Sequence, residues 1–239
     1  MRTDRKKSVF LVMSIGKIML STMLIITLAF MTSAHAEPIV GDIIQFGGLD
    51  WRLLDVQGNR ALIITENIVE LLPYNAEPKS VTWETCTLRE YLNGEFCSKF
   101  SKEEQERIIE TRISNTDNLW YETNGGAETT DKVFLLSLEE VDKYFGETGD
   151  YMNKIRKAYA GNHPNGEWVP IDDGYAFINA NDSDRIAKFN NEAWLWWLRS
   201  PGNTNDYAAS VLLYGEVHVS GLGVGYANGG VRPALFINL

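Results

Sequence analysis

The sequence has few of the residues that build metal sites and disulfide frameworks. Its 239 residues include three histidines and two cysteines. These counts argue against zinc-rich and disulfide-rich folds. Basic residues are also scarce, because 22 Lys and Arg stand against 32 Asp and Glu. An acidic chain is a poor match for the phosphate backbone of nucleic acids, so we expect no nucleic-acid partner.

Common catalytic motifs are missing as well. His163 and His218 have neither H-x-x-x-H nor H-E-x-x-H spacing, and no G-x-S-x-G segment or phosphate-binding glycine loop occurs. Hydrophobic residues make up 44% of the chain and charged residues 23%, which is typical of a globular protein. We therefore name no catalytic residue, and favour a protein that is not an enzyme.

The N-terminal segment has the pattern of an export signal. Four basic residues within residues 1–7 precede an apolar run that ends at Met31 and is followed by Ala34-His35-Ala36. Signal peptidase reads such small residues, so residues 1–36 are predicted to be a signal peptide cleaved after Ala36. An uncleaved anchor is the alternative, because the apolar run is long enough to span a bilayer. Lys17 within that run favours cleavage.

Cleavage would leave residues 37–239, which we interpret as a single domain. Removing residues 1–36 takes away five basic residues and one acidic residue, which leaves 17 basic and 31 acidic groups and a net charge of −14. We expect a secreted or cell-surface protein. It would contact a membrane only if the signal stayed uncleaved. Export permits a disulfide between Cys86 and Cys97. A helix through both would place them about 16 Å apart, so we expect free, buried thiols unless Asn93-Gly94 breaks that helix.

The order of predicted elements indicates a mixed α+β fold. Three short apolar runs separated by glycines indicate a β-meander, and two Ser-x-x-Glu capping boxes indicate helix starts. Strands return near the C-terminus, so we expect the terminal strands to pair in a twisted antiparallel sheet with a few helices and long loops. The meander covers Ile43 to Phe46, Trp51 to Val56 and Ala61 to Thr65. Helices are expected to begin at Thr87, Ser101 and Ser137, and a further helix is expected at Tyr151 to Ala160. Residues 161–181 are expected to be a loop with one strand near Tyr175.

Two acidic clusters are the candidate metal ligands. Asp172-Asp173 and Asp182-x-Asp184 supply carboxylates at loop spacing, and exported proteins meet millimolar calcium. Asp172, Asp173 or Asp182 would also suit a cell-envelope hydrolase acting on a glycan. Turn formation and loop capping are the alternative role for these side chains. We expect no resident cofactor, with calcium as the one candidate ion.

The last third of the chain is rich in aromatic and amide residues. Such side chains stack on sugars and anchor protein partners, and long loops on a rigid sheet often carry binding sites. The candidate ligand-binding residues are Trp197, Asn203, Asn205, Asp206, Tyr207, Tyr214 and Tyr226. Core packing is the alternative for Trp197, because its strand would be apolar on both faces. Structural roles are expected for Trp194, Trp196, Arg199 and Arg232, the arginines tying loops to the core.

Several motifs carry a resemblance to a bacterial domain-of-unknown-function family found in exported and surface proteins. They are FGGLDWRLLDV at residues 46–56, TWETCTLREYLN at 82–93, WLRSPG at 197–202 and GGVRPAL at 229–235. The ending also resembles, more distantly, the C-type-lectin-like fold of formylglycine-generating enzymes. That resemblance implies a twisted sheet with terminal strands paired. It does not transfer the chemistry, because those enzymes use a late cysteine pair and no cysteine follows Cys97.

The sequence thus predicts an exported, non-catalytic binding module of C-type-lectin-like fold. Its expected partner is a surface glycan, a peptide or a partner protein. The alternatives are the cell-envelope hydrolase described above and a structural protein of the envelope that associates with its own kind.

Overall fold

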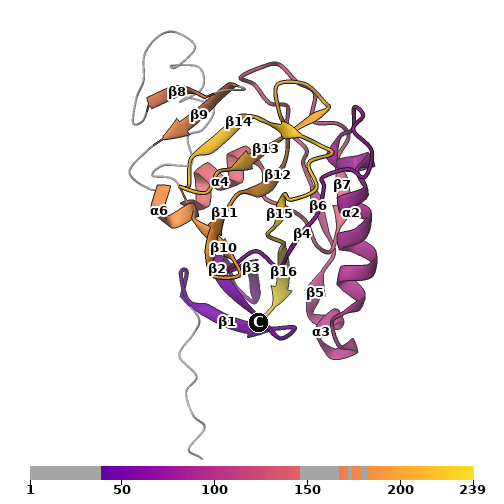
Figure 1. The fold of residues 1–239 in the computed structure, drawn as a ribbon. Helices are drawn as coiled ribbons and strands as arrows, with labels where there is room; N and C mark the ends of the chain where they lie inside the picture. Colours follow the sequence, from indigo (N-terminus) through magenta and orange to yellow (C-terminus); the bar gives the residue numbers. More distant parts are fainter. Residues whose placement is uncertain (1–38, 146–166, 172–173, 179–181) are drawn as a thin grey trace, which may run out of the picture. The chain divides into compact units, whose positions relative to one another are not determined.

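A computed structural model describes residues 39–145, 167–171, 174–178 and 182–239 (Figure 1). The predicted signal peptide and the helix predicted at Tyr151 to Ala160 lie outside these residues. The fold is mixed α+β with mostly antiparallel sheets and few helices, as predicted. No helix among the described residues combines the length and the apolar character needed to cross a membrane.

A five-stranded sheet joins both ends of the described chain. Its order is β1 (Ile43–Phe46), β2 (Leu49–Gln57), β3 (Arg60–Thr65), β16 (Ala234–Asn238) and β5 (Ile108–Ile109). The predicted β-meander is therefore confirmed, since β1, β2 and β3 pair in sequence order. The last strand, β16, pairs with β3 rather than with β1. This choice buries β3, whose residues are all covered except the partly exposed Arg60.

A seven-stranded sheet occupies most of the C-terminal third. Its order is β4 (Glu70–Leu71), β15 (Gly230–Val231), β12 (Trp196–Pro201), β13 (Tyr207–Val211), β14 (Val217–Gly223), β9 (Gly174–Ile178) and β8 (Glu167–Ile171). All its pairings are antiparallel except that of β12 with β15. The prediction of one strand in residues 161–181 was incomplete, because β8 and β9 form a hairpin there. Apolar and polar residues do not alternate clearly around Trp168 and Val169, so the sequence alone does not reveal strand β8.

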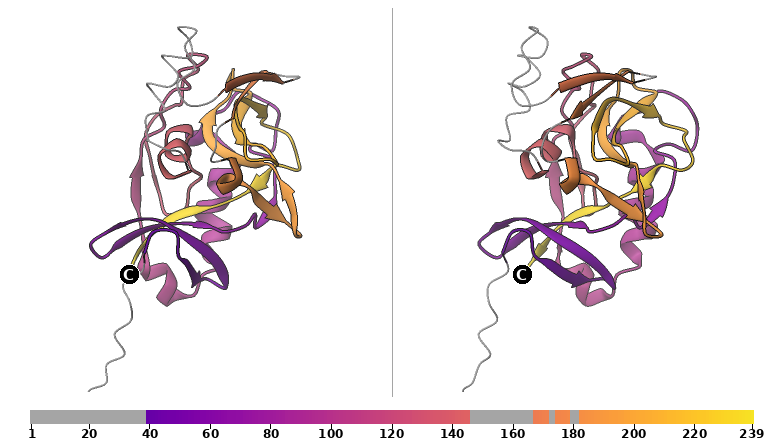
Figure 2. Two further views of the ribbon diagram at one scale, coloured as in Figure 1. Left: turned by 90° about the vertical axis from the view of Figure 1, so that its left-hand side faces the viewer. Right: turned by 60° about the vertical axis from the view of Figure 1, so that its left-hand side comes forward.

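Two short ribbons complete the strands. They are β6 (Thr111–Ile113) with β7 (Thr129–Asp131), and β10 (Ala187–Phe189) with β11 (Glu192–Trp194). In both views of Figure 2 the β1–β2 hairpin (indigo) and the β13–β14 hairpin (orange to yellow) keep to opposite ends of the described region.

The helices begin where the capping signals predict. Ser101 caps α3 (Lys102–Arg107), with its hydroxyl accepting from Glu104 N at 3.2 Å and Glu104 returning a contact to Ser101 N at 2.9 Å. The same exchange between Ser137 and Glu140 starts α4 (Leu138–Phe145). Such reciprocal contacts satisfy backbone N–H groups that have no partner in a helix's first turn. The other helical segments among the described residues are η1 (Trp83–Thr85), α2 (Thr87–Tyr91), a π-helical turn η2 (Leu92–Phe96) and α6 (Asp182–Arg185).

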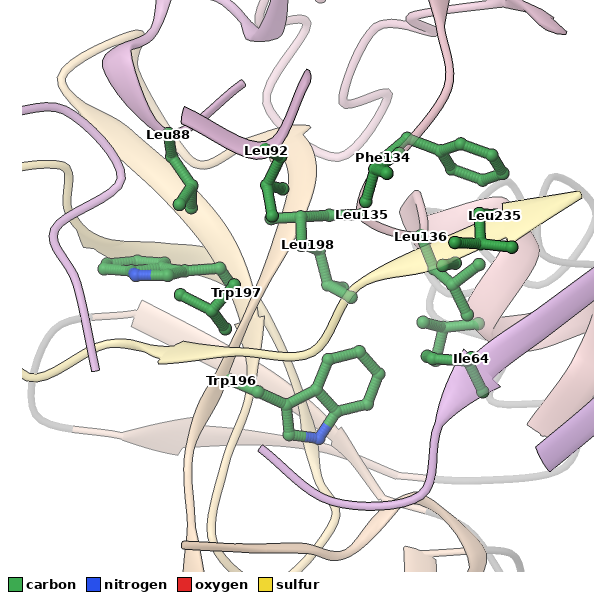
Figure 3. Close-up of a cluster of buried hydrophobic side chains, with 14 of the residues drawn as sticks. Ile64, Leu88, Leu92, Phe134, Leu135, Leu136, Trp196, Trp197, Leu198 and Leu235 are labelled. Atoms are coloured by element: carbon green, nitrogen blue, oxygen red, sulfur yellow. The ribbon is translucent and has the colours of Figure 1, made fainter. Parts of the chain in front are cut away.

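The core lies between α2, the segment 133–136 and strand β12. Figure 3 shows Leu88 and Leu92 directed toward Leu198 and Trp197, with Trp196 beneath them. Leu92, Trp196, Trp197 and Leu198 have no exposed surface. Burial of each large apolar side chain contributes about 1.5–3 kcal/mol before the cost of ordering is subtracted. Strand β12 is therefore covered on both faces, which explains the apolar run from Trp196 to Leu198 at its start.

The two cysteines are free and buried. Cys86 precedes α2, and its sulfur accepts from Arg89 N at 3.4 Å, so it acts as the helix cap. Burial raises the pKa of the Cys86 thiol to about 12. A thiol so protected from ionisation is a poor nucleophile at neutral pH.

Candidate functional site

Most of the predicted ligand-binding residues lie at one end of the β13–β14 hairpin. Asn203, Asn205 and Asp206 form the turn that enters β13, and Tyr207 faces Gly223 in the strand register. Tyr226 follows β14 and is 40% exposed. We name this set the loop end.

Contacts with neighbouring segments hold the loop end in place. Asn205 Nδ2 donates to Asn124 O at 2.8 Å, and Asn205 O accepts from Val81 N at 2.8 Å. Thr123 Oγ1 donates to Asn203 O at 2.9 Å. The Asn205 amide and the Asn203 carbonyl are thus engaged in fixing the turn, and the exposed Asp206 accepts a hydrogen bond from Thr204 Oγ1.

Two predicted ligand residues lie elsewhere. Tyr214 is 69% exposed at the far turn of the hairpin, next to the Val211–Val217 pair. Strand β13 (Tyr207–Val211) separates the two tyrosines and by itself spans about 13 Å, at about 3.3 Å for each step along the strand. Trp197 lies in the core with no exposed surface, and its Nε1 donates to Leu72 O at 2.9 Å. The tertiary structure therefore corrects the surface role predicted for Trp197, because no face of its indole is open to a ligand.

The four residues expected to be structural make internal contacts. Trp194 is partly exposed and donates to Asn228 O at 2.8 Å, whereas Trp196 is buried and donates to Arg185 O at 3.0 Å. Arg232 is 1% exposed and donates to the carbonyls of Thr65 and Glu66 at 2.9 and 3.2 Å.

The guanidinium of Arg232 also lies 4.9 Å from the Trp196 ring. A cation over an aromatic face recovers part of the energy lost on leaving water. Burial nevertheless lowers the pKa of Arg232 to about 10. Arg199 donates to Leu135 O at 2.8 Å and pairs with Glu140, so both arginines tie separate segments to β12 and β15.

The predicted acidic clusters are only partly described. Asp172 and Asp173 lie outside the described residues, and of Asp182 only the backbone, in α6, is described. Asp184 is exposed in the same helix. In the part of the chain that the structure describes, no three His, Cys, Asp or Glu side chains gather as a metal site would require.

The structure reveals a groove that the sequence did not indicate. It consists of two adjoining pockets that share Leu49 and Val69. The first, named the Phe96 pocket, has a volume of about 250 Å³ and is lined by Gly47, Leu49, Val69, Glu70, Phe96, Lys99 and Phe100. The second, named the Asn67 pocket, has a volume of about 380 Å³ and is lined by Gln45, Gly48, Leu49, Asp50, Thr65, Asn67, Ile68 and Val69. Together they fall in the size range of small-ligand sites.

A tight turn between β1 and β2 forms one wall of the groove. Gly47 and Gly48 have φ values of +59° and +72°, which glycine adopts at little cost. A Cβ on Gly47 would lie 2.2 Å from the ring of Phe100, which precedes α3, so only glycine lets the turn approach that ring this closely. Gly47 N donates to Glu104 Oε1 at 2.9 Å. The hydrogen bond from Ser101 N, followed by this one from Gly47 N, lowers the pKa of Glu104, which keeps that carboxylate charged.

A polar network borders the Phe96 pocket. The phenol of Tyr91 donates to Glu70, and Lys99 Nζ donates to the Tyr91 oxygen at 2.7 Å. Burial, followed by the contact with Glu70, raises the pKa of Tyr91. The Tyr91 contact raises the pKa of Lys99, whose ammonium also lies 5.7 Å from the Phe96 ring. At neutral pH Tyr91 therefore keeps its phenolic proton and Lys99 keeps its ammonium charge, and both groups face Glu70.

The Asn67 pocket is more polar. Asp50 Oδ1 accepts a hydrogen bond from Gln45, and Asn67 Oδ1 accepts from Lys188 N at 3.2 Å. Thr65 is 1% exposed, and its hydroxyl has no hydrogen-bond partner among the residues that the structure describes. A buried hydroxyl without a partner is unusual, and at a pocket lining a ligand is one way to supply the partner.

Comparison with known families matches residues 58–239 to the family model described as Domain of unknown function (DUF6273). The chain belongs to this family. Three of the four motifs noted above, at 82–93, 197–202 and 229–235, lie within the DUF6273 match, and the motif at 46–56 precedes it. The match therefore includes the Thr65–Glu70 and Phe96–Phe100 walls of the groove but not the β1–β2 wall. No curated protein and no solved structure matches the chain.

Sequence reasoning missed the groove because its walls come from three distant segments. The one local signal was the Gly47-Gly48 pair, which marks a turn but says nothing of its neighbour. Phe96 and Phe100 are spaced like core residues, and they do pack on the core with 4% and 5% exposure. Only the approach of the turn to α3 makes them the floor of a pocket.

Proposed function

We propose that this protein is an exported, non-catalytic binding module that holds a segment of a surface glycan, peptide or partner protein in the groove. The observation that carries the proposal is the pair of adjoining pockets between the β1–β2 turn, the segment 65–70 and the segment 96–100. Their linings combine an apolar floor with a few polar groups, which is the usual composition of a binding site.

The ionisation of the polar network favours binding over catalysis. A general base at neutral pH needs a pKa near that pH. The pKa values of Tyr91 and Lys99 are both raised, so each group keeps its proton and serves as a hydrogen-bond donor. The Tyr91 proton is donated to Glu70 and a Lys99 proton to Tyr91, so neither group is set to take a proton from a ligand.

Export and fold complete the proposal. The small-residue pattern ending at Ala36 supports a cleaved signal peptide and a single secreted or cell-surface domain of residues 37–239. A C-type-lectin-like fold is proposed from the GGVRPAL ending and from the pairing of β16 with β3, which brings the chain ends into one sheet. Folds of this kind host many functions, so the groove and not the fold carries the functional argument.

The test is a binding screen of the exported product of the full-length chain. Glycan and peptide arrays are probed with and without calcium, using the wild type, a groove-filling variant and a matched control. Val69→Trp places a large ring where the two pockets meet, whereas Leu213→Trp adds the same ring at an exposed position of the β13–β14 turn.

We expect wild type and Leu213→Trp to bind the same ligands and Val69→Trp to lose them. Equal binding by all three proteins would move the site away from the groove, and an Asp206→Asn variant would then test the loop end. An array without any ligand under both calcium conditions would contradict the proposal.

A further inference from the structure

The two pockets of the groove differ in charge as well as in polarity. At the Phe96 pocket, Glu70 faces both the Tyr91 phenol and the Lys99 ammonium, with a Lys99 Nζ to Glu70 Oε1 distance of 4.0 Å. That carboxylate is neutralised by the protein itself. A ligand entering the Phe96 pocket therefore meets mainly the apolar side chains of Leu49, Val69 and Phe96.

The Asn67 pocket keeps an unneutralised charge. Asp50 is exposed and its hydrogen-bond donor is the neutral amide of Gln45. It forms no ion pair with any residue in the described ranges, whereas the nearby Glu66 is paired with Arg52 at 2.5 Å. The carboxylate and the partnerless Thr65 hydroxyl would both accept hydrogen bonds from a cationic group.

The backbone beside the groove favours an extended ligand. Glu70 lines the Phe96 pocket and belongs to β4, which is the end strand of the seven-stranded sheet and pairs only with β15. Extended peptides commonly bind along such edges, with alternate side chains entering neighbouring pockets. Side chains two residues apart share one face and lie about 7 Å apart, which suits two pockets with a common wall.

We propose that the ligand of the groove is an extended peptide segment with an apolar residue and a basic residue at positions i and i+2. The apolar side chain enters the Phe96 pocket, and the basic side chain reaches Asp50 and Thr65 in the Asn67 pocket. This inference rests on the proposed function, since it names the ligand class of that same groove.

The test titrates four probes into the exported product of the full-length chain by isothermal calorimetry. The first is the capped peptide Ala-Leu-Ser-Lys-Ala. In the second, Glu replaces its Lys, and in the third, Ser replaces its Leu. The fourth is a neutral chain of four N-acetylglucosamine units, which represents a glycan ligand.

We expect the first peptide to bind most tightly. Replacement of its Lys by Glu should weaken binding about 5-fold, as for an exposed ion pair, and replacement of its Leu should weaken it about 10-fold through lost apolar burial. Asp50→Asn, a change at an exposed side chain that leaves the fold intact, should abolish the preference for Lys over Glu, whereas Asp206→Asn should preserve it.

Equal binding of the Lys and Glu peptides would overturn the inference. Binding of the oligosaccharide alone would also overturn it. If Val69→Trp then removed the binding of the oligosaccharide, the groove would still be the site, and its ligand would be a glycan. Failure of all four probes together with an empty array screen would overturn both proposals.

Discussion

Arg199 of β12 and Glu140 of α4 form a two-contact ion pair between residues 59 positions apart in sequence. Arg199 Nη2 donates to Glu140 Oε1 at 3.1 Å, and Nη1 donates to Oε2. Glu140 Oε2 also accepts from Ser137 N at 2.9 Å, so one carboxylate starts helix α4 and neutralises a buried arginine. The pair therefore couples the start of helix α4 to strand β12 of the larger sheet.

Loss of the arginine should destabilise the protein strongly. Arg199 is 4% exposed, and its removal leaves the carbonyls of Leu135 and Ser114 without their donor as well as Glu140 without its cation. We expect Arg199→Met to lower the free energy of unfolding by about 3 kcal/mol, measured by urea denaturation. Glu140→Gln, which keeps the helix cap, should cost about 1–2 kcal/mol. A cost below about 0.5 kcal/mol for Arg199→Met would show that the pair is not needed for stability.

Replacement of Asn118 by an acidic residue should destabilise the protein. Its Nδ2 donates to the carbonyls of Pro201 and Val219 at 2.9 and 2.8 Å, and the residue is fully buried. Asn118→Asp would face those carbonyls with a carboxylate that cannot donate, which should cost about 3 kcal/mol at pH 7. Burial should raise the pKa of the introduced acid, so its protonated form donates again at low pH. The melting-temperature gap between Asn118→Asp and wild type should therefore narrow from pH 7 to pH 4, and a constant gap would contradict this explanation.

Gly229 should accept no side chain. A Cβ at this position would lie 1.9 Å from Nε1 of the buried Trp197. We expect Gly229→Ala to cost about 2–3 kcal/mol and to change the tryptophan fluorescence, since the indole must move. Gly223→Ala is the matched control, because a Cβ there meets nothing within 4 Å. Equal melting temperatures for the two variants would refute the predicted clash.

Ionisation of Cys86 should weaken the fold in alkali. Its folded pKa is about 12 against an ordinary value of 9.0, so the unfolded state loses its proton first. The contribution of the protonated thiol to the free energy of unfolding is complete below pH 9. It falls as the pH rises toward 12, by at most about 1.4 kcal/mol per pH unit. Burial also raises the pKa of Tyr74, so part of this loss of stability with rising pH should persist in a Cys86→Ala variant. The free energy of unfolding, measured by urea denaturation at pH 8, 9 and 10, should fall less steeply with pH for Cys86→Ala than for wild type. Identical pH dependences would contradict the assignment.

Local sequence patterns were sufficient to predict several strands and helix starts. Glycine-separated apolar runs predicted β1, β2 and β3, and the Ser101–Glu104 and Ser137–Glu140 boxes predicted where α3 and α4 begin. These features were readable because alternation and capping depend on residues only a few positions apart. The same local reasoning predicted two free, buried cysteines, which the structure confirms.

The surfaces that those elements create depend on contacts between distant parts of the chain. Tyr207 and Tyr214 belong to one aromatic-rich segment, yet strand β13 carries them to opposite ends of a hairpin, and Trp197 turns into the core. The groove needs Asp50, Thr65 and Phe96 to meet from separate elements. Hydrophobic periodicity tells which face of an element is buried but not which partner buries it, because strand pairing and loop approach depend on contacts between residues far apart in the chain.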